Sequence, residues 1–179
     1  MAQYMLIHLW RRKRRLPMNS NIYRQLCFYT DGAYSSKTEM GGWAAICIEN
    51  ERVIDVQSGY EPYSTNNRME LMAFLSALEN IDTIETTSTK VIIYTDSAYI
   101  ANCINQRWYS NWMKNGWRTS DKQEVKNQDL WRRILALYIK HHEHFNLEVI
   151  KVKSHANNRW NAYADLLAVK ARKKLETEE

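Results

Sequence analysis

The most restrictive feature of the sequence is an apolar run that does not alternate with polar residues, VIIY at positions 91–94. Such a run needs apolar neighbours on both faces, which is typical of a parallel strand covered by helices on both sides. Three other β-prone segments precede it, at residues 25–30, 42–49 and 52–60, and Asp31-Gly32 after the first of them predicts a turn. Asn50 and Glu51 separate the last two segments and predict a hairpin. These runs together predict a sheet that mixes parallel and antiparallel strands.

Helical spacing appears in the segments between and after these runs. Leu71, Leu75 and Leu78 recur three and four residues apart, which predicts a helix over residues 69–80. The same reasoning predicts three more helices and one last strand, at residues 97–105, 127–140, 162–175 and 145–151 respectively. Residues 106–126 are rich in Trp and basic residues and only weakly periodic. The order predicts an α/β fold, with a mixed sheet flanked by helices.

Composition argues against a disordered, a fibrous or a membrane-spanning protein. The 179 residues suit one domain, and the 45% hydrophobic and 25% charged content is that of an ordinary globular chain. No apolar run approaches the roughly 18 residues of a membrane-spanning helix, so we expect no membrane association. The cysteines Cys27, Cys47 and Cys103 are widely spaced and odd in number, which favours a reducing compartment and a cytoplasmic location.

The net charge of +5 comes from a short segment at the start of the chain. Residues 1–20 contain a basic run at positions 11–15 and no acid, whereas the acids and bases of residues 21–179 balance. We expect residues 1–20 to be a disordered basic extension and residues 21–179 to be the folded domain. The alternatives are an organelle transit peptide, a phosphate-binding or nuclear signal, or translation that begins at Met18.

Two acidic residues follow similar apolar strands. FYTDG at residues 28–32 and IYTDS at residues 93–97 each place an aspartate, Asp31 and Asp96, at the end of a strand. In open α/β sheets the ligand crevice lies at the carboxyl ends of the strands. Two desolvated carboxylates there repel each other unless a cation lies between them. The alternative for each aspartate alone is that it caps a turn or a helix.

Two more acids strengthen the case for a metal site. Glu70 lies in the first turn of the predicted helix at 69–80, and Asp165 lies on a helix otherwise rich in Ala and Leu. Carboxylate oxygens suit Mg²⁺, with Mn²⁺ as the alternative. The histidines of residues 141–144 (HHEH) lack the spacing of a zinc site, and we interpret them as a polar junction between a helix and a strand.

These motifs together resemble type 1 ribonuclease H, the bacterial ribonuclease HI form with a basic protrusion. The resemblance rests on Asp31-Gly32, residues 65–73 (TNNRMELMA), residues 95–97 (TDS), and residues 153–155 (KSH) with Asp165 ten positions later. Residues 112–117 (WMKNGW) and 125–127 (VKN) extend the similarity through the basic segment. It covers about residues 24–172 and implies a ribonuclease H-like fold, a five-stranded mixed β-sheet flanked by α-helices. By this resemblance we expect residues 21–179 to be the ribonuclease H catalytic domain.

The resemblance implies an enzyme that cleaves the RNA strand of RNA–DNA hybrids endonucleolytically to a 5′-phosphomonoester. The family mechanism is a two-metal-ion phosphodiester hydrolysis. By this resemblance Asp31 bridges two metal ions, and Asp165 shares the ion that activates the attacking water. Glu70 and Asp96 hold the ion on the leaving-oxygen side. His155 matches a mobile histidine that aids proton transfer or product release.

The same resemblance implies a set of substrate contacts. Asn66 and Asn67 correspond to residues at the hybrid's minor groove, where 2′-hydroxyls distinguish RNA from DNA. Thr65 and Asn127 correspond to a pocket for a phosphate of the DNA strand. An apolar channel wall against the DNA sugars is expected from Trp108 and Trp112. The basic protrusion supplies phosphate attraction through Lys114, Arg118, Lys122 and Lys126.

Some positions depart from the family pattern. Lys37 stands where a groove-contacting Asn is usual, Ala98 replaces a Gln that touches bases, and Tyr63 replaces a phosphate-pocket Arg of some members. We expect the protein to act as a monomer on an RNA–DNA hybrid. The alternative functions are a non-cleaving hybrid-binding protein of the same fold, or a nuclease of the integrase or resolvase type.

Overall fold

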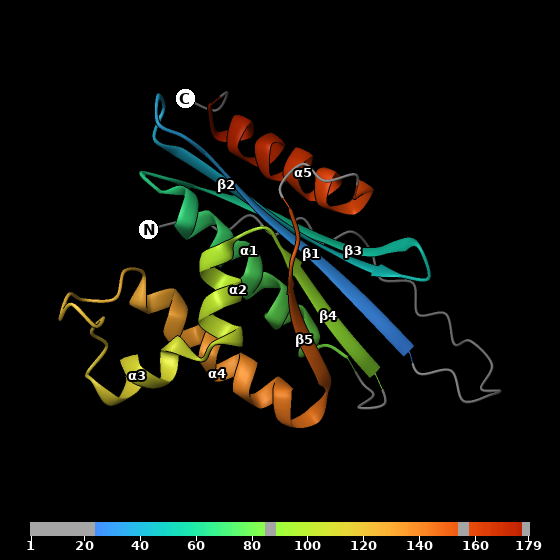
Figure 1. The fold of residues 1–179 in the computed structure, drawn as a ribbon. Coiled ribbons are helices and arrows are strands. Elements are labelled where there is room, and N and C mark those ends of the chain that lie inside the picture. The colour runs from blue at the N-terminus through green and yellow to red at the C-terminus, as the bar shows by residue number, and fades with distance from the viewer. Residues whose placement is uncertain (1–23, 85–88, 154–157, 177–179) are drawn as a thin grey trace.

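The architecture is a single mixed sheet with helices on both faces (Figure 1). The computed structural model describes residues 24–84, 89–153 and 158–176. Its five-stranded sheet has the order β3-β2-β1-β4-β5. The strands are β1 (Arg24–Ser35), β2 (Met40–Glu49), β3 (Arg52–Pro62), β4 (Thr89–Thr95) and β5 (Asn146–Lys151). Strands β1 to β3 pair antiparallel, whereas β4 pairs parallel with β1 and with β5, so the predicted mixed sheet is confirmed.

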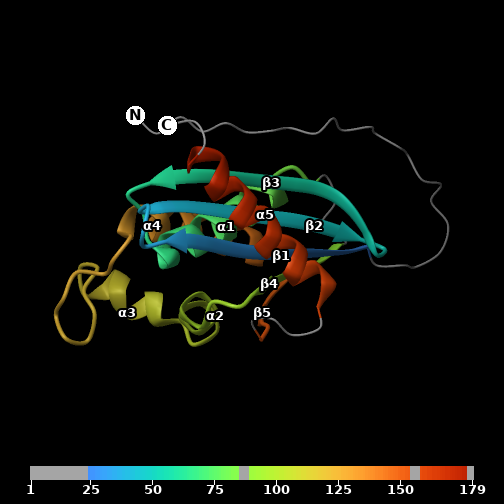
Figure 2. The ribbon, with the colours of Figure 1, turned by 90° about the horizontal axis from the view of Figure 1, so that it is seen from above.

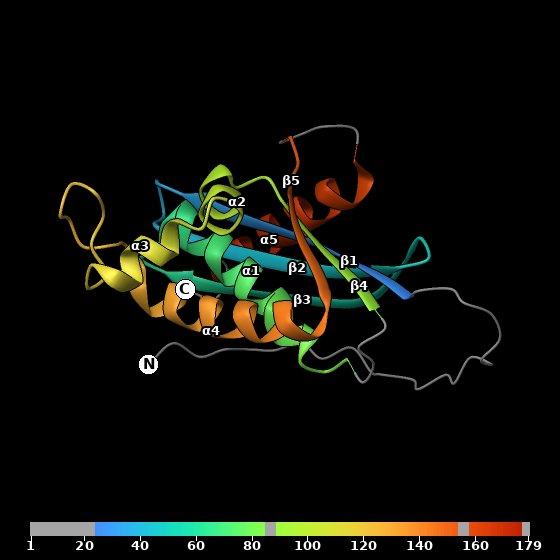
Figure 3. The same cartoon turned by 60° about the horizontal axis from the view of Figure 1, so that its bottom comes forward.

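The helices divide unequally between the two faces of the sheet. They are α1 (Asn66–Ile81), α2 (Ala98–Asn105), α3 (Trp108–Lys114), α4 (Gln128–His144) and α5 (Arg159–Glu176). Helix α5 packs on β1, β2 and β3 from one side, and α1 packs on β1 and β2 from the other (Figure 2). Helix α4 lies against α1 on the side away from the sheet (Figure 3). None of the described helices is long and apolar enough to cross a membrane.

The first strand is longer than predicted. The turn predicted at Asp31-Gly32 is wrong, because β1 continues to Ser35 through antiparallel pairing with β2, from Cys27↔Ile48 to Ser35↔Met40. The turn falls at residues 36–39. The hairpin predicted at Asn50 and Glu51 is confirmed, and both residues have the positive φ angles, 49° and 58°, that a tight hairpin turn requires.

Helix α1 forms the centre of the larger core. Its predicted leucine stripe is confirmed, since Leu71, Leu75 and Leu78 are at most 2% exposed. The helix starts three residues earlier than expected, because the Thr65 side chain accepts a hydrogen bond from the Arg68 backbone N–H and caps it. Residues from Met69 to Leu78 are all buried, since α1 lies between the sheet and α4.

Helix α5 approaches the sheet closely at one glycine. A Cβ atom on Gly42 of β2 would lie 2.3 Å from the carbonyl oxygen of Ala168 and 2.4 Å from the backbone nitrogen of Arg172. A side chain at this position would therefore collide with the backbone of α5. Small residues on the helix, Ala164 and Ala168, are fully buried along the same contact.

The Trp-rich segment extends away from the sheet (Figure 3). A cluster of aromatic side chains anchors it to the rest of the protein. This segment contains α3, a helix that its weak periodicity did not predict. Its Trp112 ring lies 6.4 Å from the Tyr99 ring and 5.5 Å from the Trp131 ring, centroid to centroid. The Trp131 indole N–H donates to the Tyr99 hydroxyl oxygen (3.0 Å). The guanidinium of Arg132 lies 4.2 Å from the centre of the Trp117 ring and adds a cation–π contact.

The histidines of residues 141–144 lie in the last turn of α4 and not at a junction, because the helix extends to His144. His141 is 1% exposed, and its Nε2 lies 2.9 Å from the carbonyl oxygen of Leu78. Burial lowers the pKa of His141, although the nearby Asp82 carboxylate acts in the opposite direction. This histidine therefore packs the end of α4 against the end of α1.

We predict that replacing Trp131 by alanine lowers the free energy of unfolding by about 3–5 kcal/mol, because a fully buried indole leaves a cavity between α2, α3 and α4. Urea unfolding followed by circular dichroism measures the change. Tyr63→Ala is the control: this ring is 84% exposed, and the expected change is below about 0.5 kcal/mol. Equal effects of the two substitutions would contradict the anchoring role of the cluster.

Candidate active site

Strand register brings Asp31 and Asp96 side by side. The parallel pairing of β1 with β4 ends at Thr30↔Thr95, so the two aspartates are the next residues on neighbouring strands. Both threonines are fully buried. The Thr30 hydroxyl donates to the Tyr94 carbonyl oxygen (3.2 Å), and the Thr95 hydroxyl accepts from the Ser97 N–H (3.1 Å). These bonds fix the backbone immediately before and after the acidic pair.

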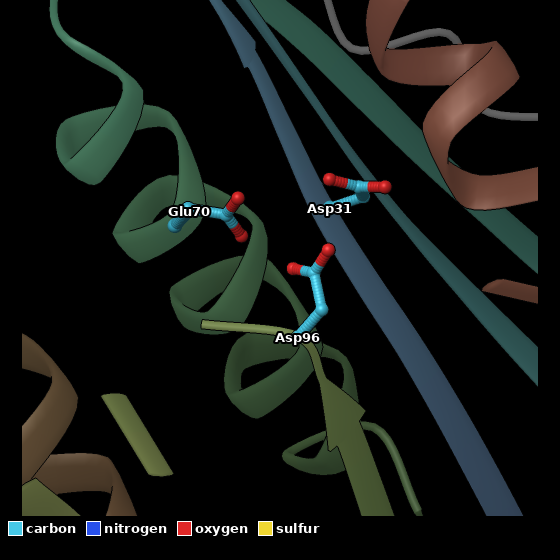
Figure 4. Close-up of side chains that lie close together, drawn as sticks. All are labelled: Asp31, Glu70 and Asp96. Atoms are coloured by element: carbon cyan, nitrogen blue, oxygen red, sulfur yellow. The ribbon is translucent and has the colours of Figure 1, made fainter. Parts of the chain in front are cut away.

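Helix α1 delivers the third carboxylate, and Gly32 lets it approach. A Cβ atom on Gly32 would lie only 2.4 Å from the backbone nitrogen of Glu70 and 2.7 Å from the carbonyl carbon of Met69. The absence of a side chain therefore allows β1 to touch the start of α1. Ligand oxygens of Asp31, Glu70 and Asp96 consequently lie within 4.8 Å of one another, each from a different element (Figure 4).

Burial makes this cluster electrostatically unfavourable without a cation. Desolvation by burial, followed by the Asp96 and Asp165 charges, raises the pKa of Asp31 to about 7. Burial likewise raises the pKa of Glu70 well above its usual value, and the charges of Asp31 and Asp96 add to the shift. Hydrogen bonds from the Gly32 N–H and the Asn66 side chain to Glu70 act in the opposite direction. The folded protein therefore holds acidic groups whose ionised forms lack compensation.

The donor set fits a divalent metal ion. Glu70 Oε2 is buried and makes no hydrogen bond with any described residue. A buried carboxylate oxygen without a partner is destabilising, and a cation would satisfy it. All three ligands offer carboxylate oxygens, which hard divalent cations prefer. We conclude that Asp31, Glu70 and Asp96 could hold such an ion together.

The other two predicted catalytic residues lie differently. Asp165 is half-buried on α5, a helix that packs on β1 and β2. Its charge helps to raise the pKa of Asp31, so it is an electrostatic neighbour, although it lies outside the group of three closest carboxylates. His155 lies outside the residues that the structure describes, as does the predicted basic extension.

The predicted groove contacts gather at the starts of α1 and α4. Thr65, Asn66 and Asn67 are exposed at the first turn of α1. Asn127 precedes α4 in the left-handed conformation (φ 56°), and its side chain makes no capping hydrogen bond. Helix capping therefore does not occupy the side chains of all four residues.

The predicted tryptophan contacts differ from each other in burial. Trp108 is half-buried, and its indole N–H donates to Gln106 Oε1 (3.0 Å). Trp112 is only 7% exposed, because its ring packs into the aromatic cluster with Tyr99 and Trp131. Little of the Trp112 side chain is exposed to a ligand. The sequence, in which Trp108 and Trp112 lie four residues apart, did not indicate this difference in burial. The basic side chains of the protruding segment are exposed, namely Lys114, Arg118, Lys122 and Lys126.

Comparisons with known proteins agree with this arrangement. The family model described as RNase H matches residues 23–173. Ribonuclease H of Chlorobaculum parvum is 41% identical over 145 residues, which are 81% of this chain and 93% of that protein. The solved structure of LC9-RNase H1, described as a type 1 RNase H with the type 2 active-site motif, is 25% identical, has a TM-score of 0.66, and covers 87% of this chain and 75% of its own. The foamy viral protease-reverse transcriptase in complex with RNA/DNA hybrid gives a TM-score of 0.72 at 20% identity, covering 94% of this chain and 22% of that one.

The fold and the site define an α/β protein with a buried carboxylate cluster suited to a metal ion. The family model and the curated relative are more specific, and together they show that the chain belongs to the ribonuclease H family. The chain is therefore a nuclease of a metal-dependent enzyme family.

We predict that the stability of the metal-free protein falls as the pH rises from about 4 to about 7. The pKa of Asp31 is about 7 in the folded state against 3.8 for the ordinary group, so folded Asp31 binds a proton that the unfolded chain has released. This contribution is fully present below pH 4, is lost by pH 7, and amounts to on the order of 2–4 kcal/mol.

Urea unfolding with a chelator, from pH 4 to pH 8, tests this dependence. Asp31→Asn should flatten the decline, whereas Asp121→Asn, on the exposed protruding segment, should follow the wild type. A decline of equal size in wild type and Asp31→Asn would refute the assignment to Asp31.

We predict that Gly32→Ala weakens binding of a divalent cation. The added methyl group pushes β1 away from Met69 and Glu70, and the overpacking lowers the free energy of unfolding by about 1–3 kcal/mol. Calorimetric titration with Mn²⁺ measures the affinity. Gly116→Asn is the control, because nothing lies within 4 Å of that site and Asn tolerates positive φ. Unchanged Mn²⁺ affinity in Gly32→Ala would contradict the role of the close approach.

Proposed function

We propose that this protein is an endoribonuclease that hydrolyses the RNA strand of RNA–DNA hybrids with Mg²⁺. The observation that carries the proposal is the convergence of the Asp31, Glu70 and Asp96 carboxylates where the pairing of β1 with β4 ends. Membership of the ribonuclease H family supports the reaction, and the hybrid-bound foamy viral structure supports the substrate. The exposed positions of Thr65 and its neighbours leave room for a nucleic acid beside the cluster.

Four carboxylates would hold the metal in this proposal: Asp31, Glu70, Asp96 and, from the other face of the sheet, Asp165. A divalent cation held there would lower the pKa of a water molecule and neutralise charge on the leaving 3′-oxygen. The charges of Asp96 and Asp165 both raise the pKa of Asp31. By the resemblance to the family, Asp31 would take part in holding both ions. Glu70 contributes the buried oxygen that has no other partner among the described residues.

The remaining residues would bind and orient the substrate. Asn66 and Asn67 carry amides that both donate and accept, and so suit the 2′-hydroxyls that mark the RNA strand. Thr65 and Asn127 would hold a phosphate of the DNA strand. Lysines and arginines of the protruding segment would add attraction that depends on salt. His155 would assist proton transfer or product release.

We predict that Asp96→Asn lowers kcat on a labelled hybrid on the order of 10³-fold while hybrid binding is retained, because one metal ligand is lost and the fold is not. Cleavage of a 5′-labelled RNA strand in Mg²⁺, with and without a chelator, measures the loss. Asp121→Asn should cleave like the wild type.

Duplex RNA and duplex DNA serve as substrate controls in the same assay. Binding of the hybrid by the wild type without RNA cleavage would instead support a non-cleaving hybrid-binding protein. Preferential cleavage of duplex DNA would support a nuclease of the integrase or resolvase type.

A further inference from the structure

Three ion pairs link α1 and its end to α4, and one of them lies at the substrate side. Arg68 binds Asp129 (2.9 Å), Arg133 binds Glu79 (2.6 Å), and Lys140 binds Asp82 (2.6 Å). Arg68 and Asp129 lie in the first turns of α1 and α4, close in sequence to Thr65 and Asn127. The other two pairs involve the far end of α1.

Arg68 contacts three elements at once. Its Nε donates to Glu61 Oε2 at the end of β3 (2.8 Å), and its Nη1 donates to both carboxylate oxygens of Asp129 (3.2 and 2.9 Å). Its backbone N–H donates to the Thr65 hydroxyl oxygen (3.2 Å). Thr65 thus caps α1 by accepting from the Arg68 backbone N–H, and the Arg68 side chain holds the start of α4 through Asp129. A planar guanidinium keeps this geometry better than a flexible ammonium.

The charge of Arg68 is already matched. Two carboxylates share one guanidinium whose side chain is 24% exposed. The group therefore has no uncompensated charge to offer an anion. In contrast, Asn127 makes no side-chain cap, and the Thr65 hydroxyl uses its oxygen for Arg68 while its own hydrogen remains available to donate.

We propose that Arg68 is a positioning residue that sets the distance between Thr65 and Asn127, and so shapes the pocket for a DNA-strand phosphate without touching that phosphate. The proposal rests on the proposed function, which assigns the phosphate to these two side chains. Arg68 acts through its ion pair with Asp129 and its backbone bond to Thr65. Loss of either ion-pair partner loosens the start of α4 relative to the start of α1, although the ion pairs at the far end of α1 remain.

The test uses hybrids whose DNA strand carries one neutral methylphosphonate, placed at each position in turn. In the wild type, a methylphosphonate at one position should raise KM more than it does at neighbouring positions, and this marked position identifies the phosphate bound in the pocket. Arg68→Ala should raise KM on the unmodified hybrid about tenfold, the equivalent of one hydrogen bond to a charged group, with kcat within about twofold. At the marked position Arg68→Ala should show little further increase, and Arg68→Lys should be intermediate.

Asp129→Asn separates a positioning role from direct phosphate binding. If Arg68 is a positioning residue, Asp129→Asn should raise KM on the unmodified hybrid as Arg68→Ala does, with little further increase at the marked position. Direct binding by Arg68 predicts the opposite sign, because removal of a competing carboxylate would free the guanidinium, and a lowered KM would overturn the proposal. Asp129→Asn is nearly isosteric, so it keeps the test valid if Arg68→Ala fails to fold.

Arg133→Ala is the matched control, since it also removes an ion pair between α1 and α4. It should leave KM unchanged at every methylphosphonate position. A KM increase in Arg68→Ala that is equal at all positions, or equal in Arg133→Ala, would overturn the proposal. Absence of cleavage by the wild type would instead refute the proposed function, so the two failures are distinguishable.

Discussion

Electrostatic repulsion among desolvated carboxylates is the constraint around which the structure is arranged. Asp31 and Glu70 are 6% and 5% exposed, and the charge of Asp31 helps to raise the pKa of Glu70. The parallel pairing of β1 with β4 and the contact between Gly32 and α1 hold these groups together regardless. Packing in the larger core, from Phe28 to Trp131, must therefore supply the stability that the cluster removes.

The sequence was sufficient for the parts of the fold that depend on local pattern. The uninterrupted apolar run at residues 91–94 identified a strand covered on both faces, and the Leu71, Leu75 and Leu78 spacing identified α1. Asp31 and Asp96 could be selected because each directly follows an apolar strand segment. Glu70 and Asp165 lie on predicted helices and could be selected because they match the family motifs. Three of the four lie together in the structure, and the fourth acts on Asp31 through space.

What the sequence could not predict depends on contacts between distant segments. Gly32 appeared to be a turn residue, yet it serves a close approach to Glu70, 38 positions further along the chain. No role for Arg68 could be predicted beyond its place in the motif at residues 65–73. Nothing in the sequence indicates that the acids Glu61 and Asp129 are its ion-pair partners. Trp112 was expected to face a ligand, but Tyr99 and Trp131 enclose it.

The contact between Gly42 and α5 has a consequence for the fourth acid. Helix α5 rests on β2 with its own backbone at Ala168 and Arg172, and Asp165 lies about one helical turn before Ala168. A contact between two backbones is stiffer than a contact between side chains, because side chains can change rotamer. The contact thereby limits movement of α5, and of the Asp165 backbone with it, toward the sheet, while the Asp165 carboxylate can still rotate.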